Sequence, residues 1–569
     1  MQIIKSTRIL LFFLFPLLVT AQSSYVPLGL KDYDLINRLE IKTGNTNLMY
    51  STVKPFNRRL YTQEVENIDS ISSAVSGNAY HLTAIDKHNM QRFLMSNSEW
   101  SKPKDAYLNK KPVLSNFFKT PANFYEVNQK DFSLIANLAI QYQFMKEKEN
   151  SQNLFYNSRG ISVRGLIGKK VGFDVFVSDN QERDPLYVQN YIAAHQSVPG
   201  VRFYKNFKAA GGVDYFDARG SISFNASKYI DIQLGYDRNF IGDGYRSLFL
   251  SDFSANALFL KFNTRIWKFN YENLFMELLP DGARVGGDKV LPRKYFRMNF
   301  LSLNATKWLN VGIFDAVMFG RKDHFDFQYL IPVLFLRPAE SDIGSGDNAL
   351  VGLNIKANIK KKIQVYGQLV LDEFLLKEVF KSNGYWANKF GYQLGIKYPD
   401  AFGIENLDLQ FENNRVRPFT YTHNDTSLSA NYVVSNFTHS NNPLTHPLGA
   451  GFQEDIFIVK YQPLKQLFLT AKAIYYKQGL DTTGSNVGTN ILRNYRDRPL
   501  GTYGYFIGTG DLVKSMNVSL LASYELLDNM FIDAGVQYRT FNRAIEGNSN
   551  TTIVSFGFRW NMARRMFDF

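Results

Sequence analysis

Eighteen stretches of alternating apolar and polar residues constrain the fold of this chain more than any other feature of its sequence. In the stretch 229–236, for example, Ile230, Ile232 and Leu234 alternate with polar residues. A period of two residues predicts a β-strand with one apolar and one polar face. In a soluble protein the apolar face lies on a core, whereas a strand that crosses a membrane turns its apolar face to lipid and its polar face to a lumen.

The predicted strands are spread along the chain from residue 134 onward. They centre on 134–144, 160–167, 171–178, 220–225, 229–236, 257–266, 270–278, 295–303, 309–318, 349–359, 363–371, 390–398, 407–412, 456–461, 467–476, 517–524, 531–539 and 551–560. The alternation is ambiguous at 456–461, so the predicted number of strands is 18 to within about two.

The links between these stretches alternate in length from the second strand onward. The short links are 168–170, 226–228, 267–269, 305–308, 360–362, 399–406, 462–466 and 526–529. The long links are 179–219, 239–256, 279–294, 319–348, 372–389, 413–455, 477–516 and 540–550. Outer-membrane barrels have short periplasmic turns and long external loops, whereas sandwich loops have no reason to keep such parity.

The sequence therefore predicts an all-β protein, a transmembrane antiparallel up-and-down β-barrel of about 18 strands in the outer membrane of a Gram-negative bacterium. A content of 33 Tyr and 48 Phe suits the aromatic girdles of such a barrel. The chain ends in an aromatic strand near Phe569, which suits recognition by the barrel-insertion machinery. We expect outer-membrane lipid and lipopolysaccharide to surround the barrel.

The predicted barrel occupies residues 131–569 and follows two other segments. Residues 1–21 combine Lys5 and Arg8 with a short apolar run, which predicts a signal peptide. Residues 22–130 predict a small helical element. Its helices are expected at 31–41, at 63–73 behind an N-cap at Thr62, and at 84–97 behind Thr83, with Asp86 completing a capping box. The chain has no cysteine, so packing and strand pairing alone must hold the exported protein together.

Several segments carry a resemblance to a known family. Residues 237–256, 367–373, 412–423 and 446–449 together resemble the capsule-assembly Wzi family. Residues 25–29, 41–42 and 54–56 are more similar to its gliding-motility, RemB-like branch. The resemblance implies an outer-membrane barrel that acts as a surface lectin. It predicts binding or anchoring of capsular polysaccharide or exopolysaccharide, in support of capsule assembly or gliding motility.

Sugar binding needs aromatic faces that stack on pyranose rings and planar donors for hydroxyls and carboxylates. Three external loops offer that mixture. The candidate polysaccharide-binding residues are Tyr245 and Arg246 in the first loop, Arg415, Arg417, Tyr421 and His423 in the second, and Tyr495, Arg496 and Arg498 in the third. Tyrosine and arginine are also common at barrel rims, where they bind lipid headgroups or each other.

A porin or channel for small anionic solutes is the alternative function. Eighteen strands enclose room for an aqueous channel, although long loops can fold in and close it. Basic residues are expected in the lumen, where they attract anions or pair with Asp231, Asp372, Glu412 and Asp533. They are Lys261, Arg265, Arg297, Lys356, Lys360, Arg539 and Arg559.

Other functions find little support in the sequence. No G-x-S-x-G or H-E-x-x-H motif occurs and there is no cysteine, so we predict a protein that is not an enzyme and carries no cofactor. His423, His439 and His446 share a loop with Asp425, but loosely spaced loop histidines are usually plain polar contacts, and we predict no metal site. The formal net charge of +14 is consistent with lipopolysaccharide phosphates and acidic polysaccharides as partners of an exported protein, and equally with solubility and internal pairing of Lys and Arg with Asp and Glu. No nucleic acid is expected.

Overall fold

A computed structural model describes residues 23–569, apart from 75–79, 111–112, 114–115, 169, 208–210, 283–289, 322–323, 333–334, 345, 425–432, 483, 497 and 546. The predicted signal peptide, residues 1–21, lies outside the described residues. None of the described helices is long and apolar enough to cross a membrane.

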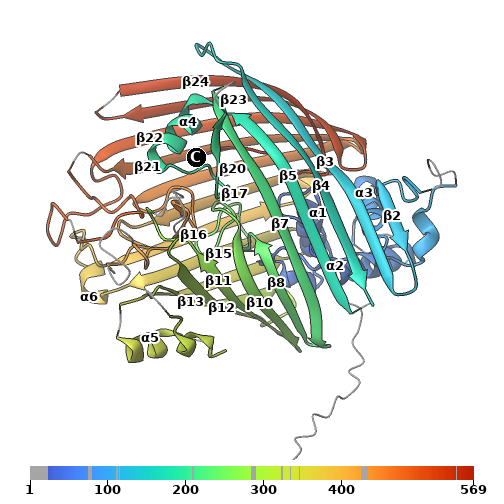
Figure 1. Ribbon diagram of the computed structural model, residues 1–569, viewed down its shortest axis with the longest axis horizontal. Helices are drawn as coiled ribbons and strands as arrows, with labels where there is room; N and C mark the ends of the chain where they lie inside the picture. The colour runs from blue at the N-terminus through green and yellow to red at the C-terminus, as the bar shows by residue number, and fades with distance from the viewer. Residues whose placement is uncertain are drawn as a thin grey trace, which may run out of the picture.

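The described strands form one closed barrel in which every neighbouring pair is antiparallel (Figure 1). Eighteen strands make the wall, as predicted. They are β3 (Phe132–Glu147), β4 (Leu154–Ile167), β5 (Val171–Arg183), β7 (Gly212–Ser227), β8 (Ile230–Asp237), β10 (Ala257–Ile266), β11 (Phe269–Leu278), β12 (Lys294–Asn304), β13 (Leu309–Phe319), β14 (Asn348–Ile359), β15 (Ile363–Glu373), β16 (Lys389–Tyr398), β17 (Leu407–Val416), β20 (Phe452–Leu464), β21 (Leu467–Leu480), β22 (Asp511–Leu527), β23 (Met530–Arg543) and β24 (Gly547–Trp560). Strand β24 pairs with β3 and closes the wall.

Short strands accompany the wall at several places. Strands β2 (Tyr125–Asn128) and β6 (Lys205–Phe207) pair with β3 and β7. Two small ribbons lie apart from the wall: β1 (Val53–Lys54) with β9 (Phe240–Ile241), and β18 (Thr438–His439) with β19 (Asn442–Pro443).

The two faces of the wall differ in polarity in the way the alternation predicts. Outward-facing Leu234 and Phe556 are 52% and 59% exposed, whereas inward-facing Gln233 and Lys261 are buried. Large apolar side chains exposed on most strands give the barrel an apolar outer surface, which is the surface that lipid requires.

The alternation of short and long links is confirmed, with one exception. The last external link was expected at 540–550, but β23 continues to Arg543 and β24 begins at Gly547. The difference arises because Phe541 pairs with Ser549 and Asn542 with Asn548, so the two strands extend as a hairpin almost to the turn.

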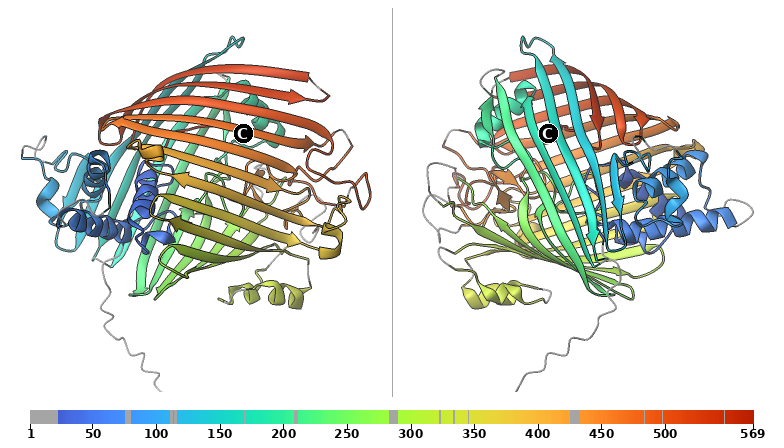
Figure 2. Two further views of the ribbon diagram at one scale, coloured as in Figure 1. Left: turned by 180° about the vertical axis from the view of Figure 1, so that it is seen from behind. Right: turned by 45° about the vertical axis from the view of Figure 1, so that its right-hand side comes forward.

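Three helices of the N-terminal part lie together at the short-turn end of the barrel (Figure 2). They are α1 (Asp32–Thr43), α2 (Arg58–Ala74) and α3 (Ala84–Ser96). Their shared core includes the fully buried Leu39, Val65 and Met90. Short 3-10 helices follow at Leu48–Tyr50 and Lys104–Tyr107 in this part, and at Phe327–Leu330 and Ala401–Gly403 in the barrel.

The predicted capping box of α3 is confirmed, whereas the predicted start of α2 is wrong. The Thr83 side chain accepts a hydrogen bond from the Asp86 N–H, and the Asp86 carboxylate accepts one from the Thr83 N–H. Helix α2 begins at Arg58 and contains Thr62 as a buried residue. The Asn57 side chain accepts a hydrogen bond from the Leu60 N–H at 3.1 Å, so Asn57 supplies the cap that was assigned to Thr62.

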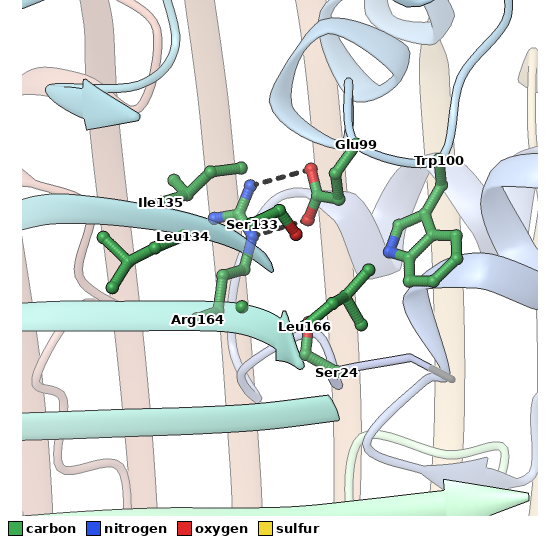
Figure 3. A pocket seen from close by; sticks show the side chains of 9 residues that line it. Ser24, Glu99, Trp100, Ser133, Leu134, Ile135, Arg164 and Leu166 are labelled. Carbon is green, nitrogen blue, oxygen red and sulfur yellow. Dashed lines mark hydrogen bonds and ion pairs between the residues drawn. The ribbon is translucent and has the colours of Figure 1, made fainter. Parts of the chain in front are cut away.

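Ion pairs fasten these helices to the short turns of the barrel. Arg38 on α1 pairs with Asp400 at 2.9 Å and with Asp408, and Arg92 on α3 pairs with Asp528 at 2.8 Å. Figure 3 shows another pair at the seam, where Glu99 lies 2.8 Å from Arg164 of β4. The cavity left there, beside Trp100, is only about 10 Å³, so the seam is closely packed.

The lumen holds a ribbon built from both ends of the barrel. Strand β1, which comes from the helical side, pairs with β9, which belongs to the external loop between β8 and β10. Lys356 of β14 lies 3.1 Å from Glu40 of α1 and 2.9 Å from Asp243 of that loop. Chain from the two sides of the barrel therefore meets inside it.

Residues 561–569 also run inside the barrel. Strand β24 ends at Trp560, so Phe569 is not part of it, contrary to the expectation of an aromatic strand near Phe569. Arg565 pairs with Glu182 of β5 at 2.8 Å, and Asp568 pairs with Arg246 at 3.1 Å. Figure 1 marks the end of the sequence within the barrel. These buried ion pairs hold the segment in the lumen, because each charge left alone there would be costly.

The described parts of the link between β13 and β14 lie against the outside of the wall, where helix α5 (Arg337–Ile343) is visible beside the barrel (Figures 1 and 2). Arg297 of β12 lies beneath this link, and its Nε donates to the carbonyl oxygen of Tyr329 at 3.1 Å. Arg297 was expected in the lumen. It faces outward because it alternates with Phe296 and Met298, which belong to the interior core.

Lys360, also expected in the lumen, lies exposed in the turn between β14 and β15.

Candidate functional site

Three external loops converge at the long-link end of the barrel. They are residues 374–388, 417–451 and 481–510, and the first contains helix α6 (Leu376–Val379). Arg417 joins them: its Nε donates to the Asn388 carbonyl at 2.7 Å, and its NH2 group donates to the carbonyls of Tyr385 at 3.2 Å and Tyr505 at 3.3 Å. Arg417 thus fixes the loops relative to each other through their backbones.

Beside Arg417 lies an aromatic-cationic cluster, which we define as Trp386, Lys389, His423, Tyr495 and Arg498. The Trp386 and Tyr495 rings lie 4.8 Å apart, and the Arg498 guanidinium lies 3.9 Å from the Trp386 ring centre. The Lys389 Nζ lies 4.3 Å from the Tyr495 ring centre, and His423 meets that ring edge-on at 5.6 Å. Trp386, Tyr495 and Arg498 are half-buried, so part of each side chain is open to solvent.

The cluster is positively charged on balance. Lys389 is fully buried and its Nζ donates to Glu373 and to the Thr422 carbonyl, both at 3.0 Å. Arg498, in contrast, donates to the carbonyl oxygens of Tyr495 and Gly501 and lies over Trp386. Within the described part of the chain, the Arg498 guanidinium therefore has no acidic hydrogen-bond partner. An aromatic face next to such a guanidinium can stack on a ring and bind a carboxylate.

The structure brings together only some of the candidate residues. His423, Tyr495 and Arg498 belong to the cluster, and Arg417 supports it. Arg496 is exposed next to the cluster, with its N–H donating to the Asn494 side chain at 2.9 Å.

Arg415 and Tyr421 lie apart from that surface. Arg415 is exposed on the outer face of β17, opposite to the inward-facing Glu412 and Asn414. Tyr421 is fully buried, and its hydroxyl donates to the Leu248 carbonyl at 2.9 Å. Tyr421 therefore holds the loop 417–451 against the loop between β8 and β10, which lies inside the barrel.

Tyr245 and Arg246 lie in the interior, within the network that holds residues 561–569. The Arg246 guanidinium lies 3.2 Å from Glu454 and 3.1 Å from Asp568. The Tyr245 hydroxyl donates to Asp568 and accepts a hydrogen bond from Lys472 at 2.7 Å. Every one of these partners comes from the chain itself, so the network acts to fill the lumen.

The loop histidines are also occupied by internal contacts. His439 accepts a hydrogen bond from the Leu279 N–H at 3.0 Å and its other ring nitrogen donates to the Asn256 carbonyl at 3.2 Å. Burial lowers the pKa of His439 to about 3 and also lowers the pKa of His446, although Glu454 at 2.6 Å opposes the second shift. Asp425 lies outside the described residues, and no group of three or more possible metal ligands occurs in the part of the chain that the structure describes.

Trp386 and Lys389 are members of the cluster that were not among the sequence candidates. The sequence 384–386 (Gly-Tyr-Trp) places two aromatic residues in a long external link, which is the signal that could have identified them. The link 374–388 contains no arginine, so it lacks the combination of tyrosine and arginine that marks the candidate loops.

Comparison with known proteins supports the architecture. No protein-family model and no curated protein matches the chain. The solved structure of Wzi, an outer-membrane protein of Escherichia coli involved in group 1 capsule assembly and described as a carbohydrate-binding β-barrel, aligns with 96% of this chain and 100% of its own length. The TM-score is 0.55 and the sequence identity 12%.

Two other outer-membrane proteins align over less of the chain. OprD of Pseudomonas aeruginosa covers 76% of this chain and 95% of its own (TM-score 0.41, 13% identity). OccAB2 of Acinetobacter baumannii covers 75% of this chain and 98% of its own (TM-score 0.40, 10% identity). The likeness to Wzi, at 12% identity, shows the fold alone. A closed barrel with an apolar outer wall is the architecture of a Gram-negative outer-membrane protein, which confirms the predicted location.

Proposed function

We propose that this barrel binds or anchors an acidic surface polysaccharide, capsular or exopolysaccharide, through the aromatic-cationic cluster. The observation that carries the proposal is the arrangement of Trp386, Tyr495 and Arg498, in which two half-exposed rings adjoin a guanidinium whose hydrogen-bond partners among the described residues are backbone carbonyls. Stacking of the sugar on the rings supplies contact area, and the guanidinium favours a uronate or another anionic substituent.

The filled lumen favours this function over the porin alternative. A channel for small anionic solutes needs a continuous aqueous path, whereas this barrel contains the β1–β9 ribbon, the Lys356 ion pairs and residues 561–569. Several inward-facing cations pair with acids of the chain, as Lys356 does with Glu40 and Asp243 and Arg559 with Asp533 at 2.8 Å. The charges of these pairs are not free to concentrate anions in the lumen.

Binding on this surface proceeds by non-covalent capture without turnover. The retained polysaccharide would support capsule assembly or gliding motility, in line with the sequence resemblance. The assignment to the RemB-like branch rests on that resemblance. Capsule assembly and gliding motility would be distinguished by how strongly the producing cell attaches to a surface.

A binding experiment with purified surface polysaccharide of the producing strain tests the proposal. Trp386→Ala should weaken binding by roughly tenfold, about 1.4 kcal/mol, because it removes the largest ring of the cluster. Trp308→Ala is the matched control, since Trp308 is exposed at a short turn of the opposite end. Polysaccharide whose carboxylates have been chemically reduced should bind more weakly to the parent protein.

Two results would reject the proposal. Equal binding by the Trp386→Ala variant and the parent protein would exclude the cluster as the sugar site. A large, steady single-channel conductance of the intact protein in planar bilayers would favour the porin function instead.

A further inference from the structure

Polar side chains form a ladder on the outer face of the wall, where an outer-membrane barrel normally faces lipid. Asn273 of β11, Asn299 of β12 and Asp315 of β13 are register partners on three adjacent strands. The Asn273 side chain donates to Asn299 at 2.7 Å, and Asn299 donates to Asp315 at 3.2 Å. All three are buried, so they are shielded from the surroundings of the barrel.

The wall below this ladder is apolar. The outward positions closer to the short turn are Leu301 and Leu303 on β12 and Leu309, Val311 and Ile313 on β13. The polar residues therefore begin within the spanning part of the same strands. Left bare at that depth, a carboxylate and two amides would face hydrocarbon without partners.

A part of the β13–β14 link covers the ladder, and we call residues 325–332 and 335–343 the flap. The Leu336 N–H donates to both carboxylate oxygens of Asp315, at 3.0 and 3.1 Å. The Tyr271 hydroxyl donates to the Pro332 carbonyl at 3.1 Å, and Tyr329 and Leu336 pack fully buried against Val317 and Phe319. The flap thus supplies a hydrogen-bond donor to Asp315 and packs against the neighbouring wall.

The opposite surface of the flap is apolar. Phe327 is 76% exposed, and Leu330, Ile331 and Phe335 are exposed beside it. Helix α5 continues the flap with the polar Arg337, Ser341 and Asp342 exposed. Strand β14, which follows the flap in the chain, presents Leu353, Ile355 and Ile359 on the lipid-facing outside of the wall.

We infer that the flap is embedded in the outer leaflet, with Phe327, Leu330, Ile331 and Phe335 among lipid acyl chains. Three observations carry the inference: the flap replaces lipid over a polar ladder, its four large exposed side chains before α5 are apolar, and the outward side chains of β14 are apolar. The polar side of α5 then lies at the headgroup level. The flap is in this way a lipid-binding part of the wall, separate from the proposed sugar surface.

Site-directed spin labelling tests the inference directly, because the chain contains no cysteine and single-cysteine variants need no background changes. Phe327→Cys and Ile331→Cys, labelled with a nitroxide and reconstituted in phosphatidylcholine vesicles, report accessibility to oxygen and to a water-soluble nickel chelate. Ile355→Cys on β14 is the lipid reference and Tyr503→Cys in an external loop the aqueous reference. All four side chains are exposed, so the substitutions remove little packing.

We expect the labels at 327 and 331 to match the label at 355, with oxygen accessibility several-fold above that of the label at 503 and little collision with the nickel chelate. Labels that match position 503 would overturn the inference, because the flap would then lie in water. Labels protected from both reagents would also overturn it, since protein and not lipid would then cover the flap.

Discussion

The Lys356 ammonium lies 2.9 Å from the Asp243 carboxylate and binds the wall of the barrel to a loop from the external side. The same ammonium lies 3.1 Å from Glu40 of α1. One buried cation therefore connects the wall, the external loop and the helical part.

Removal of this cation should destabilise the filled barrel. Lys356→Met leaves Glu40 and Asp243 buried without their partner, which we expect to cost about 3–5 kcal/mol. The temperature at which the folded, fast-migrating form disappears in gel electrophoresis should fall. Lys362→Met, at an exposed position of the adjacent turn, is the control. An unchanged transition in Lys356→Met would mean that the ion pairs do not hold the interior together.

Arg417 and Arg415 provide a matched pair of arginines. Arg417→Ala should loosen the three external loops, because it removes hydrogen bonds to Asn388, Tyr385 and Tyr505 that are together worth about 2 kcal/mol or more. Limited proteolysis should cleave residues 374–388 and 481–510 faster. Arg415→Ala should leave cleavage unchanged, since Arg415 lies on the outer face of the wall. Equal cleavage of the two variants would contradict the clamping role.

Gly384 is expected to be essential for placing Trp386. Its φ is +71°, and a Cβ atom there would lie 2.7 Å from the Tyr505 nitrogen and 2.9 Å from the Gly504 nitrogen. Gly384→Ala should therefore separate two of the loops and weaken polysaccharide binding. Gly501 has nearly the same φ, +72°, with no atom near its missing Cβ, so Gly501→Ala should cost only about 1 kcal/mol of backbone strain. Comparable loss of binding in both variants would show that strain alone is responsible.

Docking of the loop 417–451 should weaken as the pH falls. Burial holds the pKa of His439 at about 3, whereas an exposed histidine titrates near 6.5. Between these values the undocked loop binds a proton that the docked loop does not. The free energy of docking is therefore most favourable above about pH 6.5. Below that pH the docked loop loses up to about 1.4 kcal/mol of stability per pH unit.

Hydrogen exchange of residues 434–446 at pH 7.5 and pH 5, compared with His439→Gln at each pH, measures this effect. Glutamine keeps a donor and an acceptor but does not titrate, so the variant should lose part of the pH dependence, with His446 contributing the remainder in the same direction. An identical pH response in the variant and the parent protein would refute the prediction.

The barrel could be predicted from sequence because its signals are local. Alternation within a strand and the length of each link do not depend on distant parts of the chain. The errors arise where local signals end: Arg297 has a charge typical of a lumen residue, yet the flap, which is distant in sequence, covers it on the outside. The short last hairpin was missed because residues 547–550 are polar and show no alternation.

The candidate site was less predictable for a related reason. His423, Tyr495 and Arg498 come from two loops that meet only in the folded protein, where the structure brings these three side chains together. Tyr245, Arg246 and Tyr421 have the same composition but lie in the interior, because the loop that carries Tyr245 and Arg246 folds into the lumen and Tyr421 packs against it. The direction in which a long loop folds is set by contacts such as Lys356 with Asp243, which no local pattern reveals.

The short ribbon of β1 and β9 links two compartments of the cell. Val53 pairs with Ile241 and Lys54 with Phe240, so backbone from the periplasmic side is hydrogen-bonded to backbone from the outer surface. A force that pulls the external loop outward would act on this ladder as well as on strands β8 and β10, which carry the loop. The helical part would in this way share a load placed on the outer surface.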